Sequence, residues 1–271
     1  MIASALAPHG DIRATSRREL DLANPDSIVA TITGSKPWLI VNAAAYTAVD
    51  RAEDDVDAAF AVNARAPAIL ADEARRCGAL LIHFSTDYVF DGNSRTSYAE
   101  DAPTAPLNVY GASKLAGEQA IASSGVAALV FRTSWVYGAS GSNFLTTIRR
   151  LARERDELRI VADQVGVPNW THTLADAVQR IVAMGEAAMA ERSGLYHLSS
   201  AGQASWYDFA KAIVGEGSST RVVPITTAEF VRPARRPAHA VLDTAKFQAS
   251  FGFALPHWRS ELASCLQEFP V

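Results

Sequence analysis

The sequence predicts an α/β protein built on a doubly wound parallel sheet, with a smaller C-terminal lobe. Short runs rich in β-branched and aromatic residues alternate with longer helix-forming runs along most of the 271 residues, as expected for parallel strands joined by crossover helices. Polar and aromatic residues follow two of the apolar runs directly, at 85–92 and 134–138. Since ligands of open α/β sheets bind outside the carboxyl ends of the strands, we expect a site at that edge.

The first part of the chain supplies short strands and well-marked helices. Residues 11–16 and 38–44 are predicted to be strands. Between them, Asn24 suits a helix N-cap and Pro25 suits the first helical position, where its missing N–H costs nothing. A long alanine-rich helix is predicted over 57–77.

The same alternation continues to the C-terminal half. The long helix ends at Gly78, a residue that terminates helices well because it adopts the left-handed conformation easily. Further strands are predicted at 79–86, 127–134, 159–162 and 195–199, and further helices at 108–123, 143–155, 171–190 and 205–215.

The composition excludes several kinds of partner. A net charge of −4 provides no basic surface for nucleic acid. No apolar run approaches the roughly 20 residues that a membrane span requires, so no membrane association is expected. Cys77 and Cys265 are the only cysteines, which indicates no disulfide framework and fits a reducing cytoplasm best.

Tyr110 and Lys114 have a spacing that suits proton transfer. Residues four apart lie on the same face of a helix, so the lysine ammonium is expected beside the tyrosine phenol. That neighbour would lower the pKa of Tyr110 from about 10, and a shift to neutrality needs roughly 3 units, or about 4 kcal/mol. The pair would then donate and accept protons near pH 7, as carbonyl reduction requires. The spacing alone is common on helix surfaces.

Several motifs in order along the chain strengthen this interpretation. They are Arg17–Leu22, Val41–Asp50, Ser85–Gly92, Tyr110–Lys114, Thr133–Gly138, Asp163–Pro168, and Arg236-Pro237 with Leu242-Asp243. Together they resemble the dTDP-4-dehydrorhamnose reductase family of extended short-chain dehydrogenases/reductases. The resemblance implies a Rossmann-like fold and the NADPH- or NADH-dependent reduction of the C4 keto group of dTDP-4-dehydro-L-rhamnose to dTDP-L-rhamnose. The resemblance leaves open whether the protein forms a homodimer.

The resemblance also divides the chain into lobes. Residues 1–140 are expected to form the NAD(P)-binding domain, to which 159–190 returns. Residues 141–271 are expected to form mainly the substrate-binding lobe. In that lobe 231–237, rich in proline and arginine, cannot continue a helix and is predicted to be an ordered loop.

Three residues carry the chemistry that the resemblance implies. Tyr110 would protonate the alkoxide that develops at C4. Lys114 would lower the pKa of Tyr110 and hold the nicotinamide ribose. Thr86 would donate a hydrogen bond to the same substrate oxygen.

The resemblance places further residues beside the cofactor and the sugar. The cofactor residues, besides Tyr110 and Lys114, are Asp21, Leu22, Ala44, Ala45 and Thr47. Arg17 and Arg18 suit a 2′-phosphate or plain solvation, so NADPH and NADH both stay open. The substrate residues, besides Thr86, are Asp87, Trp135 and Arg236. Trp135 equally suits a core aromatic, and Arg236 a surface charge rather than a partner of the substrate diphosphate.

The chain contains no G-x-x-G-x-x-G turn, and its only glycines before residue 78 are Gly10 and Gly34. Such a turn normally lets a pyrophosphate approach a helix N-terminus. We therefore expect a first strand and a glycine-rich loop upstream of Met1, with the strand between residues 11–16 and 79–86. Without them, poor solubility and weak NAD(P)H binding are expected.

The histidines suggest no metal site. His83 lies in an apolar strand pattern and is expected to be a hydrogen-bonded core histidine. Some family members hold Mg²⁺ through a glutamate at the position of His172, and imidazole serves this hard cation poorly. We therefore expect no metal.

Two alternatives remain open at this point. Relatives of the family serve as the non-catalytic regulatory subunit of methionine adenosyltransferase, which the missing glycine turn favours and the retained Thr86, Tyr110 and Lys114 disfavour. The chain also suits another nucleotide-sugar reductase or an epimerase.

Overall fold

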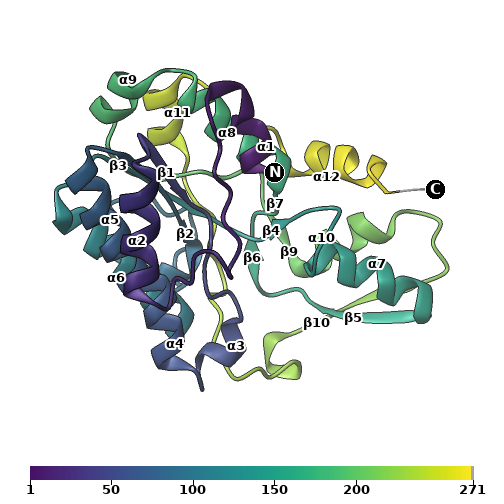
Figure 1. Ribbon diagram of the computed structural model, residues 1–271. Coiled ribbons are helices and arrows are strands. Elements are labelled where there is room, and N and C mark those ends of the chain that lie inside the picture. The colour runs from purple at the N-terminus through teal and green to yellow at the C-terminus, as the bar shows by residue number, and fades with distance from the viewer. Residues whose placement is uncertain (270–271) are drawn as a thin grey trace.

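The computed structural model describes residues 1–269. Its main sheet contains four parallel strands in the order β1-β2-β3-β8, and its second half carries three two-stranded sheets (Figure 1). The strands are β1 (Leu39–Asn42), β2 (Leu80–Thr86), β3 (Ala128–Thr133), β4 (Val136–Tyr137), β5 (Glu157–Val161), β6 (Val165–Gly166), β7 (Asn169–Trp170), β8 (Gly194–His197), β9 (Ala204–Ser205) and β10 (Arg221–Ile225).

Helices connect these strands and cover the main sheet. They are α1 (Ile2–Leu6), α2 (Pro25–Ser35), α3 (Val49–Ala52), α4 (Val56–Phe60), α5 (Ala66–Cys77), α6 (Val109–Ser124), α7 (Phe144–Glu154), α8 (Thr171–Val182), α9 (Glu186–Glu191), α10 (Trp206–Val214), α11 (Ala245–Phe251) and α12 (Trp258–Gln267). No helix within residues 1–269 is both long enough and apolar enough to cross a membrane.

Each central strand buries both faces. Along β2, Leu80 and Ile82 enter the core formed with α8 and α11, while Leu81 between them enters the core formed with α2 and α5. Such two-sided burial is expected of a parallel sheet covered by helices on both faces. Figure 1 shows α2, α5 and α6 on one side of the sheet and α1, α8 and α11 on the other. The predicted doubly wound fold is confirmed.

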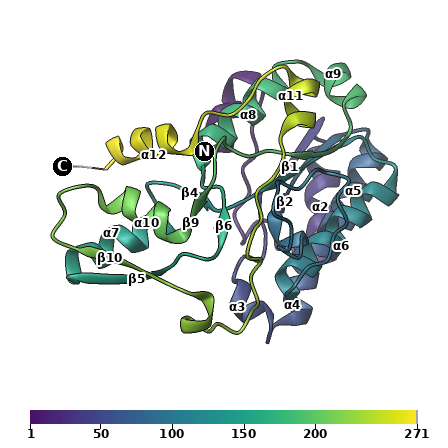
Figure 2. The same ribbon diagram turned by 180° about the vertical axis from the view of Figure 1, so that it is seen from behind.

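The second lobe packs beside the carboxyl ends of the strands. It contains α7, α10 and α12 with the pairs β5–β10, β4–β7 and β6–β9 (Figure 2). Its own core gathers around Trp258, Phe209 and Tyr137. Segments of the C-terminal half return to the main sheet, because β8 pairs with β3 and both α8 and α11 pack on the face that α1 also covers. The chain therefore returns to the main sheet in α8, which lies within the expected 159–190, and again in β8 and α11.

Most predicted elements are present. Asn24 caps α2 by accepting hydrogen bonds from the N–H groups of Asp26 and Ser27. The helix predicted over 57–77 continues as α4, a π-helical turn at Ala61–Arg65 and α5, and it ends at Gly78 with φ 74°. The helix predicted over 171–190 is divided into α8 and α9.

The strand predicted over 11–16 is wrong. All six residues are exposed and lie in irregular backbone. A strand needs a neighbour for its N–H and C=O groups, and this segment has none in the described chain. The expected place of a further strand, between residues 11–16 and 79–86, is wrong too, because β2 pairs with β1 on one side and β3 on the other.

Candidate active site

The predicted catalytic residues meet where β2 ends and α6 begins. Asn108 caps α6 by accepting a hydrogen bond from the N–H of Gly111, which places Tyr110 in the first turn. A Cβ at Gly111 would lie 2.2 Å from the carbonyl oxygen of Tyr88, so only glycine lets the helix approach so closely. This close approach brings Tyr110 against the turn that follows Thr86.

Thr86 and Asp87 form a buried polar pair at the end of β2. The Thr86 hydroxyl donates to Asp87 Oδ1 over 3.0 Å, and Asp87 is 2% exposed. Its second oxygen, Oδ2, has no hydrogen-bond partner among the described residues. Burial raises the pKa of Asp87 to about 7 against the opposing effect of the Thr86 hydroxyl. A carboxyl with such a pKa can exchange a proton near neutrality.

The environment of Tyr110 differs from the expected one. Burial raises the pKa of Tyr110 to about 12; the Thr86 hydroxyl lowers it and the charge of Asp87 raises it further. The expected lowering by Lys114 is therefore wrong for the protein without a bound cofactor. Within residues 1–269 no hydrogen bond joins Lys114 to Tyr110, because the lysine amine is engaged elsewhere.

Lys114 is buried among strand groups. Its Nζ donates to the carbonyl oxygen of Phe84 over 2.5 Å and lies 3.2 Å from His83 Nε2. Burial lowers the pKa of Lys114 to about 8, while the Glu118 carboxylate favours the charged form. A pKa of about 8 lies close to neutral pH, so the charge of this amine is sensitive to its surroundings.

His83 contacts Lys114, and the sequence does not indicate this contact. It is fully buried, as predicted, and its Nδ1 lies 3.1 Å from Asn42 Nδ2. Its other ring nitrogen faces Lys114 rather than the apolar core. The sequence marks His83 only as a polar residue in an apolar strand, since the pairing that brings Asn42 opposite it on β1 is a tertiary contact.

The predicted cofactor residues lie just beyond the end of β1 and just before α2. Ala44 and Thr47 are exposed and Ala45 is half-buried just beyond the carboxyl end of β1, the edge that also holds Thr86. Asp21 is half-buried, with Oδ1 accepting from the N–H of Ala23, while Leu22 packs on the core beneath α2.

This arrangement fits one end of a nicotinamide dinucleotide. The small exposed residues Ala44 and Thr47, just beyond the carboxyl end of β1, would receive the cofactor at this edge of the sheet. For the pyrophosphate, residues 1–269 present no glycine-rich turn at a helix N-terminus. The predicted loop upstream of Met1 stays a prediction.

Trp135 packs against the aromatic core of the second lobe. Its ring stacks on Trp206 with centroids 3.5 Å apart and planes 8° from parallel. Its backbone has φ 42°, a left-handed conformation that is costly for a bulky side chain. A Cβ at Gly166 would lie 2.7 Å from the ring, so only glycine fits beneath it. The half-buried ring is thus held in a fixed position just beyond the carboxyl end of β3.

Arg236 is held by a carboxylate. Its Nη1 and Nη2 each donate over 3.0 Å to Asp50, which follows β1. Arg232 also contacts Asp50, at 2.9 Å. Burial acts to raise the pKa of Asp50, but the Arg236 hydrogen bonds and charge lower it overall. These contacts attach the loop predicted at 231–237 to α3 of the sheet domain.

His172 is half-buried at the start of α8 and pairs with Glu268, their nearest atoms 3.1 Å apart. Within residues 1–269, no three His, Cys, Asp or Glu side chains gather as a metal site. The expectation that this chain uses no metal remains a prediction.

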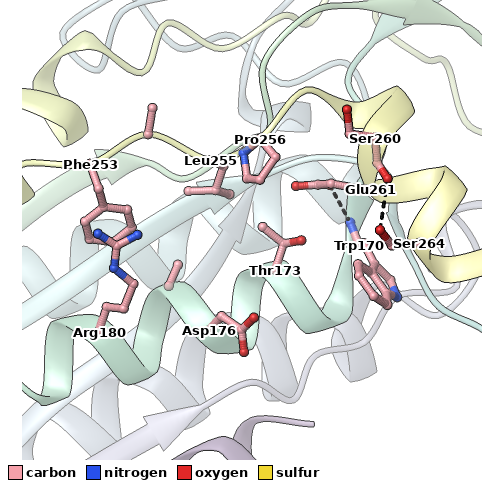
Figure 3. A pocket seen from close by; sticks show the side chains of 12 residues that line it. Trp170, Thr173, Asp176, Arg180, Phe253, Leu255, Pro256, Ser260, Glu261 and Ser264 are labelled. Atoms are coloured by element: carbon pink, nitrogen blue, oxygen red, sulfur yellow. Dashed lines mark hydrogen bonds between the residues drawn. The ribbon is translucent and has the colours of Figure 1, made fainter.

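A cavity of about 420 Å³ lies elsewhere, between α8 and the segment that leads into α12 (Figure 3). Figure 3 shows Arg180 against Phe253 at one end and Glu261 near Trp170 at the other. None of the predicted site residues lines this cavity.

The sheet and the polar rim together define a nucleotide-dependent reductase of the extended short-chain dehydrogenase type. The chain matches the family described as RmlD substrate binding domain over residues 1–271. It belongs to this family, whose curated members include dTDP-4-dehydrorhamnose reductases.

Individual relatives agree over nearly their whole lengths. The chain is 46% identical to a dTDP-4-dehydrorhamnose reductase of Burkholderia thailandensis, with 98% of this chain and 94% of the relative covered. It is 42% identical to a probable dTDP-4,6-dihydroxy-2-methyloxan-3-one 4-ketoreductase of Streptomyces antibioticus, covering 93% and 85%. A crystal structure of the Bacillus anthracis dTDP-4-dehydrorhamnose reductase in complex with NADP superposes with a TM-score of 0.93 at 34% identity, covering 99% and 94%.

Proposed function

We propose that this protein reduces the C4 keto group of dTDP-4-dehydro-L-rhamnose with NADPH or NADH and so produces dTDP-L-rhamnose. The observation that supports this most is the meeting of Thr86, Tyr110 and Lys114 at one rim, on the edge of the sheet that faces the second lobe. The names of the relatives point to the same substrate class.

The cofactor, when bound, supplies the hydride. Tyr110 delivers a proton to the C4 oxygen, and its raised pKa keeps the phenol protonated until that oxygen becomes basic. Thr86 holds the same oxygen by a hydrogen bond. Lys114 binds the nicotinamide ribose and brings positive charge to Tyr110 once the amine turns from the Phe84 carbonyl.

The sugar and its diphosphate bind between the lobes. The stacked Trp135 and Trp206 rings offer an apolar surface to the sugar, and Asp87 lines the opposite wall with its free oxygen. Arg236 binds the diphosphate while Asp50 holds its guanidinium in place. In this assignment the sheet domain carries the cofactor and the lobe with Trp206 carries most of the substrate contacts.

A direct assay tests the proposal. The purified protein is mixed with NADPH, or with NADH, and dTDP-4-dehydro-L-rhamnose, and cofactor oxidation and dTDP-L-rhamnose formation are measured. The dTDP-4,6-dihydroxy-2-methyloxan-3-one named for the Streptomyces antibioticus relative serves as a competing substrate. A protein that binds NADPH yet oxidises it with neither sugar contradicts the reductase assignment. The regulatory-subunit alternative instead predicts a complex with methionine adenosyltransferase that does not depend on Tyr110.

Localisation and assembly complete the proposal. We place the protein in the cytoplasm, because both cysteines are free thiols and its substrate is a nucleotide sugar. A homodimer is compatible with the family. Light scattering after size-exclusion chromatography measures the assembly state.

A further inference from the structure

The buried amine of Lys114 has an unusual pair of neighbours. Asn42, His83 and Lys114 are 5%, 0% and 2% exposed, so water does not supply their hydrogen bonds. Asn42 lies opposite His83 in the β1–β2 register, and His83 reaches Lys114 on α6. Three elements thus bring one amide, one imidazole and one amine into a row.

The hydrogen-bond pattern of this row is demanding. Asn42 Oδ1 accepts from the N–H of Ala44 over 3.3 Å, so Asn42 Nδ2 donates to His83 Nδ1. A neutral His83 then carries its proton on Nε2, which points at Lys114 Nζ. Two donors facing each other repel, so this arrangement suits an uncharged Lys114 whose lone pair accepts from Nε2–H.

A charged Lys114 requires the opposite arrangement. The ammonium must donate to an unprotonated Nε2, which moves the histidine proton to Nδ1. Asn42 must then turn its amide so that Oδ1 accepts from Nδ1–H. This turn gives up only the long bond to the exposed Ala44, whose N–H water can satisfy. In each state a donor therefore faces an acceptor at both His83 nitrogens, and the two states differ in charge by one proton on Nζ.

We propose that Asn42 and His83 are positioning residues that let Lys114 change its charge while it stays buried, through coupled exchange of the His83 tautomer and the Asn42 amide orientation. The proposal rests on the proposed reductase function only where it concerns rate. It assigns to Asn42 and His83 the control of the pH at which Lys114 is charged beside Tyr110.

Other charged groups around Lys114 leave this control to His83. On α6, Glu118 favours the charged lysine but already binds Arg132 of β3 through two nitrogens. At the mouth of the site, Asp87 acts on Tyr110. No carboxylate within residues 1–269 forms an ion pair with Lys114.

The first test uses the protein without cofactor. With lysine labelled by ¹³C and ¹⁵N, the four lysines give a simple spectrum in which Lys114 is assigned by its absence from a Lys114→Met variant. Histidine ¹⁵N spectra report the His83 tautomer, assigned likewise with His83→Leu. We expect Nδ1–H at pH 6 and Nε2–H at pH 10, with the same midpoint as the Lys114 titration. One unchanged tautomer across that range overturns the proposal, and the titration itself is measured on the wild-type protein.

The second test changes the relay. Asn42→Asp presents only acceptors to His83, so it should hold the Nδ1–H tautomer and raise the Lys114 midpoint by about 1 pH unit. His83→Leu removes the acceptor and should lower that midpoint. His197→Gln is the matched control, because this buried histidine faces the Asp243 carbonyl and not Lys114. An equal midpoint in all three folded variants and the wild type overturns the proposal.

A kinetic measurement separates this proposal from the reductase assignment. In active protein, the pH at which kcat/KM changes should move with the Lys114 midpoint, up in Asn42→Asp and down in His83→Leu. If the NMR midpoints move but no sugar is reduced, the relay stands and the reductase assignment fails. If the sugar is reduced with unmoved midpoints, the reverse holds.

Discussion

Two buried charged clusters lie side by side on α6, and they are satisfied to different degrees. Arg132 binds Glu118 through Nε at 3.0 Å and Nη2 at 2.6 Å, and the Ser85 hydroxyl also donates to Glu118. Four residues earlier on the same helix, Lys114 has a carbonyl and an imidazole instead of a carboxylate. The Glu118 cluster is thus paired and the Lys114 cluster is not.

This difference separates stability from reactivity. A buried charge with a matched partner holds its protonation state, and breaking the pair leaves a bare charge. A buried amine or carboxyl without a partner of opposite charge has a pKa displaced toward neutrality, as Lys114 at about 8 and Asp87 at about 7 show. We infer that the Arg132–Glu118 pair fixes α6 on the sheet, so that Lys114 can be buried without a partner of opposite charge.

The largest effect is expected from the phenol of Tyr110. Tyr110→Phe should lower kcat by about 10²–10⁴-fold, because it removes the proton donor. NAD(P)H affinity, measured by fluorescence titration, should change little. Tyr137→Phe is the control, since this buried hydroxyl has no hydrogen-bond partner among residues 1–269. Wild-type turnover in Tyr110→Phe would remove this residue from the mechanism.

The paired cluster should respond in stability. Arg132→Met leaves Glu118 buried without its partner and should lower the free energy of unfolding by about 3–5 kcal/mol. Adding Glu118→Leu removes the bare carboxylate and should restore much of that loss. Urea denaturation measures both. A double variant no more stable than Arg132→Met would show that packing, not charge, dominates this cluster.

The carboxyl of Asp87, which has no partner of opposite charge, should destabilise the folded protein when it ionises. Its pKa rises on folding from 3.8 to about 7, so the unfolded chain ionises first as pH increases. Stability is therefore lost between about pH 4 and pH 7, and the full penalty is present above pH 7. Asp87→Asn should stabilise the fold at pH 8 by at most about 4 kcal/mol and have little effect at pH 4. Thermal melts at both pH values measure this, and an equal change at both would contradict the pKa assignment.

The sequence predicted local structure and missed what depends on partners. Alternation and caps such as Asn24 and Gly78 were sufficient to place the longer helices and strands through residue 215, because those features are local. The short elements, such as α3 and the two-residue strands, were not predicted. Residues 11–16 failed because a strand exists only with a neighbour. The Tyr110–Lys114 spacing placed both residues on one helix, but the amine turned to Phe84 and His83, which lie on a strand about thirty residues earlier. The binding of Asp50 to Arg236 likewise joins residues 186 positions apart.

The smallest effect is expected at the pair of His172 and Glu268, which is only half-buried. The His172 and Glu268 side chains are 35% and 30% exposed, so solvent screens their attraction. His172→Ala should change the free energy of unfolding by no more than about 1 kcal/mol.

Imidazole also suits Mg²⁺ poorly, so EDTA should alter neither activity nor the mass measured by light scattering. Dissociation on chelation, reversed by Mg²⁺, would contradict this prediction and show that a bound cation holds the assembly together.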